Sequence, residues 1–326
     1  MNRNRQTKSL SQVLNEVDNL DKKCKRIAQL LGYRSSEIPK TYRQFISLCN
    51  SLSIVFLQFN LNQQSFNILN RAVQCDVSMF FEGSIEDRTW FGRALLYCNL
   101  GYLMIQINDT PSSLKFLYDA ESLLLEIREM SSEVDYNVED LTLAHASLTF
   151  AILCKIGRVS NAQKYLDIAV SQYNSIARKA RNTRLNKTGI ANLYCLLIPA
   201  LKILHSHEEK KMILASEVAR EILLKVNEVD IAGALLLQKY INTADEGLEM
   251  INSEEYRNIL FVTSFFPFIS NTTPVIDFEE LIFEQERTKD LPLNLSDFLN
   301  THSLSEDQDL YSLLMQEALS NVKNNH

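Results

Sequence analysis

The chain has 326 residues, of which 46% are apolar and 22% are charged, so it can bury a substantial core. Its 8 glycines and 6 prolines are too few for the many tight turns of a β-sandwich or barrel, and we predict an all-α fold. The net charge of -7 disfavours a general nucleic-acid binder, because attraction to phosphates needs a surplus of lysine and arginine.

The sequence shows neither a membrane span nor a secretory segment. No stretch approaches about 18 uninterrupted apolar residues, and Met1 is followed by polar and basic residues, a start that resembles a mitochondrial presequence only weakly. We expect an intracellular protein, cytoplasmic or cytoskeletal, with the nucleus as an alternative. The six cysteines lie at least 23 residues apart and form no metal-ligand cluster, so we expect buried, reduced thiols.

The first predicted elements are a single helix and a helical hairpin. Residues 9–31 carry apolar side chains at helical spacing, and Gly32 is a typical helix stop before a loop over 35–39. Residues 41–59 are apolar almost all round, which is typical of a helix packed between neighbours. A turn at 60–62 and a more polar helix at 63–73 complete the first hairpin.

The same alternation predicts further hairpins along the chain. The second and third are helices 89–107 and 112–129 around the turn 108–111, and helices 138–156 and 161–178 around the turn 157–160. A fourth, over 190–226, contains Pro199, which should kink its first helix. Residues 231–251 predict a last, capping pair of helices.

The second helices of the first three hairpins share a small-large-small pattern at steps of 48 and 49 residues. The aligned positions are Ser65, Leu69 and Ala72, then Ser113, Leu117 and Ala120, then Ala162, Leu166 and Ala169. Small residues let helices approach closely, while the large residue fills the groove between them. The pattern therefore predicts equivalent packing in each hairpin.

This pattern resembles the tetratricopeptide repeat. The family's aromatic, Leu-Gly, small, large and Ala positions are matched in the middle hairpin by Tyr97, Leu100, Gly101, Ser113, Leu117 and Ala120. The steps exceed the family's period of about 34 residues, the terminal proline is missing, and the first helices around Ser51 and Phe150 lack the Leu-Gly pair. The resemblance implies a right-handed α-α solenoid of divergent hairpins, an architecture that usually binds other macromolecules.

Three segments are predicted from these elements. They are an N-terminal helix and loop at 1–40, a tetratricopeptide-like domain at 41–252, and an irregular tail with a C-terminal helix at 253–326. Five phenylalanines of the tail are expected to pack back on the solenoid, with docking on another protein as the alternative: Phe261, Phe265, Phe266, Phe268 and Phe278. The helix at 305–322 caps the stack or engages a partner.

No catalytic motif is recognisable in the sequence. The chain has no glycine-rich phosphate loop, and His205 and His207 are interpreted as part of a polar turn. The acidic runs at 133–140 and 277–286 lack the spacing of a calcium or di-iron site and are interpreted as solvated loops or helix starts. We predict no cofactor, no metal and no enzymatic activity. The alternative is a helical enzyme or cofactor-binding protein whose groups converge from distant helices.

One charge run stands above the background. It carries five cations and no anion: Arg178, Lys179, Arg181, Arg184 and Lys187. Such a run can bind an acidic surface, nucleic-acid phosphate or an import receptor. The alternative is a solvated linker whose first cations complement the preceding helix dipole.

The family's clamp for a peptide carboxylate is missing. The matching positions hold Asn50 and Ile54 in the first hairpin, and Cys98 and Tyr102 in the second. A groove here should read a peptide by apolar and aromatic contact, and Tyr97 and Tyr102 are the candidate contacts. The leading hypothesis is a non-catalytic scaffold that binds one or more proteins within a larger intracellular assembly. A nucleic-acid-associated repeat that uses 178–187 is a further alternative.

Overall fold

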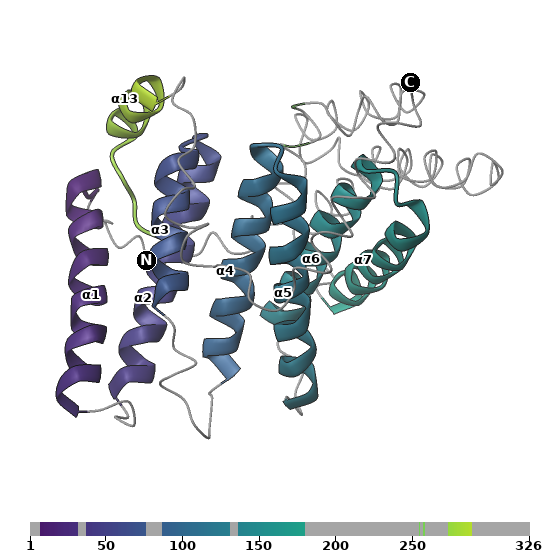
Figure 1. Ribbon diagram of the computed structural model, residues 1–326, viewed down its shortest axis with the longest axis horizontal. Helices are drawn as coiled ribbons and strands as arrows, with labels where there is room; N and C mark the ends of the chain where they lie inside the picture. The colour runs from purple at the N-terminus through teal and green to yellow at the C-terminus, as the bar shows by residue number, and fades with distance from the viewer. Residues whose placement is uncertain are drawn as a thin grey trace. The chain divides into compact units, whose positions relative to one another are not determined.

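A computed structural model describes residues 7–31, 37–75, 87–130, 136–179, 254, 257 and 273–288 (Figure 1). These residues form an all-α fold, as predicted, with one isolated parallel bridge between Lys8 and Ile276 and no strand among them. The helices are α1 (Leu10–Leu31), α2 (Glu37–Gln58), α3 (Asn62–Gln74), α4 (Asp87–Gln106), α5 (Thr110–Met130), α6 (Tyr136–Lys155), α7 (Val159–Lys179) and α13 (Phe278–Thr288). The predicted fourth hairpin, capping pair and final helix lie outside the described residues.

The helix boundaries follow the predictions to within a few residues, with one correction. The predicted loop over 35–39 is wrong for its second half, because α2 already begins at Glu37 and includes Pro39. Proline is tolerated there, since the first amides of a helix have no acceptor within the helix.

The chain divides into two compact units. One consists of Met1–Asp119 together with Asn271–His326, and the other of Ala120–Ser270, so the boundary falls within α5. The described part of the first unit contains α1 to α4, the start of α5, and α13. The second contains the rest of α5 with α6 and α7.

Three helix-turn-helix connections share one backbone geometry. Asn60, Asn108 and Gly157 each adopt a positive φ, of 55°, 61° and 72°, at steps of 48 and 49 residues. The amide of each donates to the carbonyl three residues earlier, and the next amide donates to the carbonyl five residues earlier, at 2.8 to 3.2 Å. This is the Schellman pattern, which satisfies the last carbonyls of the first helix.

The aligned small and large residues of the second helices are all buried, as the sequence pattern predicts. The hydroxyl of Ser65 donates to the carbonyl of Ser53 at 3.4 Å, and that of Ser113 donates to Gly101 at 2.8 Å. A Cβ on Gly101 would lie 2.8 Å from Leu117, so glycine permits close approach of α4 to the start of α5. The small residues therefore fix the distance between the two helices of a hairpin.

In the first unit, α2 packs against α1, α3 and α4 (Figure 1). A buried polar network lies among these helices. Asn50 donates its Nδ2 to the carbonyl of Gly92 at 2.9 Å, and Asn99 donates its own Nδ2 to Asn50 Oδ1 at 2.9 Å and to Ser53 at 3.1 Å. Because burying an unpaired amide costs free energy, these bonds favour one register of α2 against α4.

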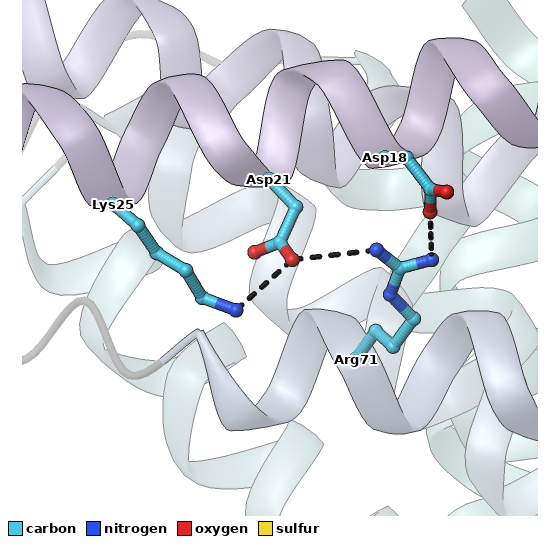
Figure 2. A network of polar contacts seen from close by, with 4 residues as sticks. All are labelled: Asp18, Asp21, Lys25 and Arg71. Carbon is cyan, nitrogen blue, oxygen red and sulfur yellow. Dashed lines mark hydrogen bonds and ion pairs between the residues drawn. The ribbon is translucent and has the colours of Figure 1, made fainter.

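Ion pairs join α1 to α3. Figure 2 shows the Arg71 guanidinium between Asp18 and Asp21 of α1, with Lys25 on the other side of Asp21. Burial alone lowers the pKa of Arg71, but hydrogen bonds from its guanidinium to the two aspartates outweigh burial and raise it. The pairs are part-exposed, so their main effect is to orient α1 rather than to stabilise it strongly.

In the second unit, α6 packs along α7. Every residue of α6 from 141 to 154 is buried. Two of its threonine hydroxyls donate within the helix: Thr142 to the carbonyl of Val138 at 2.8 Å, and Thr149 to that of His145 at 2.9 Å. The first helix of the third hairpin is thus enclosed by its neighbours.

Five of the six cysteines are buried free thiols, as predicted, and Cys195 lies outside the described residues. Burial raises the pKa of Cys154 to about 12. Among the described residues, no helix combines the length and the apolar character needed to cross a bilayer.

Candidate partner-binding surface

The two tyrosines that the sequence offers as partner contacts differ in exposure. Tyr102 is buried, so its side chain contributes to packing. Tyr97 is half-buried, and its ring stacks on Phe116 of α5 with the centroids 6.3 Å apart. Of the two, only Tyr97 is partly exposed.

The four positions that match the peptide clamp are all buried: Asn50, Ile54, Cys98 and Tyr102. Asn50 belongs to the polar network between α2 and α4, and burial raises the pKa of the Cys98 thiol. These residues pack helices together. An open groove at these positions is therefore not part of the structure.

The basic run is only partly described. Arg178 and Lys179 lie in the last turn of α7, where cations complement the helix dipole, and their side chains are outside the described set. Arg181, Arg184 and Lys187 lie wholly outside it. The binding role of this run stays a prediction.

A polar cluster connects α5, α6 and α7 in the second unit. Glu121 accepts hydrogen bonds from the Tyr165 hydroxyl at 2.6 Å and from Lys164 Nζ at 3.0 Å. The His145 ring contacts the Tyr165 ring edge-on with the centroids 5.9 Å apart, and His145 Nε2 lies 3.3 Å from Thr149 Oγ1. The cluster ties the second helices of two hairpins together.

The pKa of Glu121 reflects these contacts. Burial alone raises it, but the hydrogen bonds from Tyr165 and Lys164 outweigh burial and bring it below the usual value. A carboxylate held ionised by two donors is suited to an ion-pair role rather than to proton transfer near neutral pH. Within the described residues, no three side chains among His, Cys, Asp and Glu are placed to hold a metal ion.

The segment around α13 packs against the start of the chain. The amide of Lys8 donates to the carbonyl of Val275 at 2.9 Å, and the amide of Asp277 donates back to Lys8 at 3.2 Å. Glu280 Oε2 accepts the amide of Leu10, the first residue of α1, at 2.6 Å. α13 therefore lies at the N-terminal end of α1, as Figure 1 shows.

Two side-chain contacts link α13 to the first hairpin. Gln64 of α3 donates its amide to Glu284 Oε1 at 2.6 Å, and the Phe278 ring meets Phe59 edge-on with the centroids 5.5 Å apart. Hydrogen bonds from Arg287 and then Gln64 hold the pKa of Glu284 below its usual range. Phe278 is the one member of the five tail phenylalanines that is described, and it contacts the chain in cis.

The two faces of α13 are unusual in composition. The side that meets the first unit buries Leu281 and places the engaged Glu280 and Glu284 beside it. The outer side exposes 61% of Phe278 and 70% of Phe283. Val275 and Ile282 are also exposed, so large apolar side chains are exposed while the carboxylates of Glu280 and Glu284 are engaged by the rest of the unit. We name the four exposed residues, Val275, Phe278, Ile282 and Phe283, the α13 face.

The sequence contained one signal for this helix. Asp277 caps α13, with its Oδ1 accepting the amide of Glu279 at 2.9 Å, and two glutamates follow in the first turn. The run 277–286 is thus a helix start, one of the two interpretations offered from the sequence, inside a tail that was expected to be irregular. Its docking beside Leu10 depends on contacts across 270 residues, which no local pattern encodes.

Comparisons of this chain with protein-family models, with curated proteins and with solved structures found no match.

Proposed function

We propose that this protein is a non-catalytic helical scaffold that binds other proteins as a subunit of a larger assembly. In this proposal the three hairpins are divergent tetratricopeptide-like units of a right-handed solenoid. Support comes from the common geometry of the turns at Asn60, Asn108 and Gly157 and from the buried small residues at equivalent positions.

The observation that carries the binding role is the α13 face. Scattered exposed apolar residues are ordinary, whereas two phenylalanines and an isoleucine exposed on one 11-residue helix, with an exposed valine three residues before it, are not. Helix α13 is fixed to the first unit by backbone and side-chain hydrogen bonds, so it presents this face in a set orientation. A rigid apolar ridge is the kind of surface that a protein partner covers.

Affinity purification of the intact chain under mild salt tests the proposal. The wild type is compared with the double variant Ile282→Gln/Phe283→Gln, which leaves Phe278 on Phe59 and the caps of α1 and α13 in place. Leu125→Gln is the matched control, because Leu125 is the exposed large apolar residue of α5, with 51% exposure. Circular dichroism establishes that all three chains are equally helical.

We expect proteins that co-purify with the wild type and with Leu125→Gln to be lost from the double variant. Retention of the same proteins by all three chains would remove the α13 face from the binding role. A wild-type chain that purifies alone with a bound small molecule would instead support the cofactor-binding alternative.

A further inference from the structure

The α13 segment is strongly acidic as well as apolar. Residues 277–288 carry one cation, Arg287, and five carboxylates: Asp277, Glu279, Glu280, Glu284 and Glu286. The cation is paired internally, because Arg287 donates to both carboxylate oxygens of Glu284. The segment therefore faces its surroundings with a net negative charge.

The five carboxylates divide into two groups by position. Asp277 caps its own helix, Glu280 caps α1, and Glu284 binds Gln64 and Arg287. Glu279 and Glu286 are exposed, four residues before and three residues after Phe283. At those helical spacings they share one side of α13 with Phe283. The outer side is thus an apolar ridge with a carboxylate at each end of Phe283.

We propose that the α13 face binds a basic amphipathic helix of a partner protein. This inference rests on the proposed function, and it adds the chemistry of the partner. Apolar residues of the partner helix cover Ile282 and Phe283, and Lys or Arg residues beside them pair with Glu279 and Glu286. An amphipathic helix matches a ridge of this length, because α13 has 11 residues and spans about 16 Å, or three turns.

The same charges argue against a second copy as the occupant. Two α13 faces in contact would bring Glu279 and Glu286 of one chain against those of the other, and like charges across an interface are unfavourable. A neutral apolar partner would leave both carboxylates partly desolvated without a counter-charge. A basic partner removes both penalties.

Fluorescence anisotropy with three labelled synthetic peptides tests this inference on the full chain. The first peptide is an amphipathic helix of Leu and Lys with leucines at i, i+3, i+4 and i+7. The second keeps the leucines and replaces each Lys with Glu. The third keeps the composition of the first in a shuffled order that has no apolar stripe.

The first peptide should bind the wild type. Its affinity should fall as the ionic strength rises from about 0.01 M to about 0.15 M, because the Debye length then shrinks from about 30 Å to about 8 Å. The second and third peptides should bind at least about tenfold more weakly. Ile282→Gln/Phe283→Gln should weaken the first peptide about tenfold, while Leu125→Gln leaves it unchanged.

A charge swap gives the sharper result. Glu279→Lys/Glu286→Lys should weaken the Lys peptide and strengthen the Glu peptide, whereas Glu126→Lys/Glu129→Lys on the exposed side of α5 should do neither. Equal binding of the Lys and Glu peptides by the wild type, or binding that ignores the swap, would overturn the inference.

Sedimentation of the wild type and the double variant examines the second-copy alternative. A monomer for both chains is expected, and a dimer that the double variant abolishes would overturn the proposed partner. If co-purifying proteins depend on Phe283 while the peptides show no charge preference, the scaffold function stands and the basic partner is rejected. If neither changes in the double variant, the α13 face has no binding role and the basic partner is rejected with it.

Discussion

Glu280 of α13 accepts a hydrogen bond from the backbone amide of Leu10, the first residue of α1, across 270 residues of sequence. The cap of α1 is otherwise local, because Ser9 and Gln12 exchange hydrogen bonds in a capping box. A carboxylate at a helix N-terminus also complements the positive end of the helix dipole. The C-terminal segment thus completes the start of the first helix.

Glu280→Ala should therefore destabilise the first unit by about 1 kcal/mol, the usual cost of losing a helix-capping side chain. Glu279→Ala is the control, because Glu279 is exposed at the preceding position of the same helix. Urea unfolding with a shared m-value measures the difference. Equal midpoints for the two variants would show that the Glu280 contact contributes nothing to stability.

The left-handed turn residue offers a second prediction. Asn60 is exposed with a φ of 55°, a conformation that asparagine and glycine tolerate and that costs other residues about 1 to 2 kcal/mol. Asn60→Ala should lower the unfolding free energy by about 1 kcal/mol, and Asn60→Gly should change it by less than about 0.5 kcal/mol. Thermal and urea denaturation of both variants measures these changes. An equal loss of stability for alanine and glycine would contradict a left-handed conformation at Asn60.

Much of the hairpin arrangement could be predicted from local patterns. The turns around Asn60, Asn108 and Gly157 combine a left-handed residue with a periodic helix on each side, and both signals lie within a short window of sequence. The pattern of small residues was also informative, because the tight contact between Gly101 and Leu117 needs a residue without a side chain. Patterns within a short window of sequence therefore predicted the contacts between residues that are close in sequence.

The candidate surface could not be predicted in the same way. Tyr102 was predicted from the sequence as a partner contact, yet it is buried among neighbours that its own sequence window does not contain. The exposure of the α13 face could not be predicted either, for the opposite reason. Its phenylalanines look like core residues in sequence, and they are exposed because Glu280 and Glu284 take the inner side. Which side of a helix faces the protein depends on its distant partner.

Gly101 supports a third prediction. Gly101→Ala should gain up to about 1 kcal/mol from helix propensity, but the new Cβ would lie 2.8 Å from both Cγ and Cδ2 of Leu117. Cγ is close to the backbone and cannot move freely, so overpacking of about 1 to 3 kcal/mol should win and the variant should be less stable. Gly101→Ala/Leu117→Ala should be more stable than the sum of the single losses, because the smaller side chain removes the clash. Strict additivity in denaturant melts would contradict this contact.

The Glu121 cluster predicts a dependence of stability on pH. The pKa of Glu121 is lower in the folded chain than its usual value of about 4.3, because the donors Tyr165 and Lys164 outweigh burial. The unfolded state therefore takes up the proton first as the pH falls. The stabilisation is fully present above the usual glutamate pKa and is lost as the pH falls through the lower pKa of the folded state.

Tyr165→Phe removes the hydroxyl that donates to Glu121 at 2.6 Å and keeps the ring against His145. We expect the variant to be less stable than the wild type by about 1 kcal/mol near neutral pH, since a hydrogen bond to a charged group is lost. The difference in stability between the two chains should shrink in acid. Glu121 is then protonated, so the hydrogen bond from Tyr165 in the wild type no longer has a charged acceptor. Urea unfolding of both chains at neutral pH and below about pH 4 measures it. A gap that stays constant over that range would mean that Tyr165 acts through packing and not through the Glu121 charge.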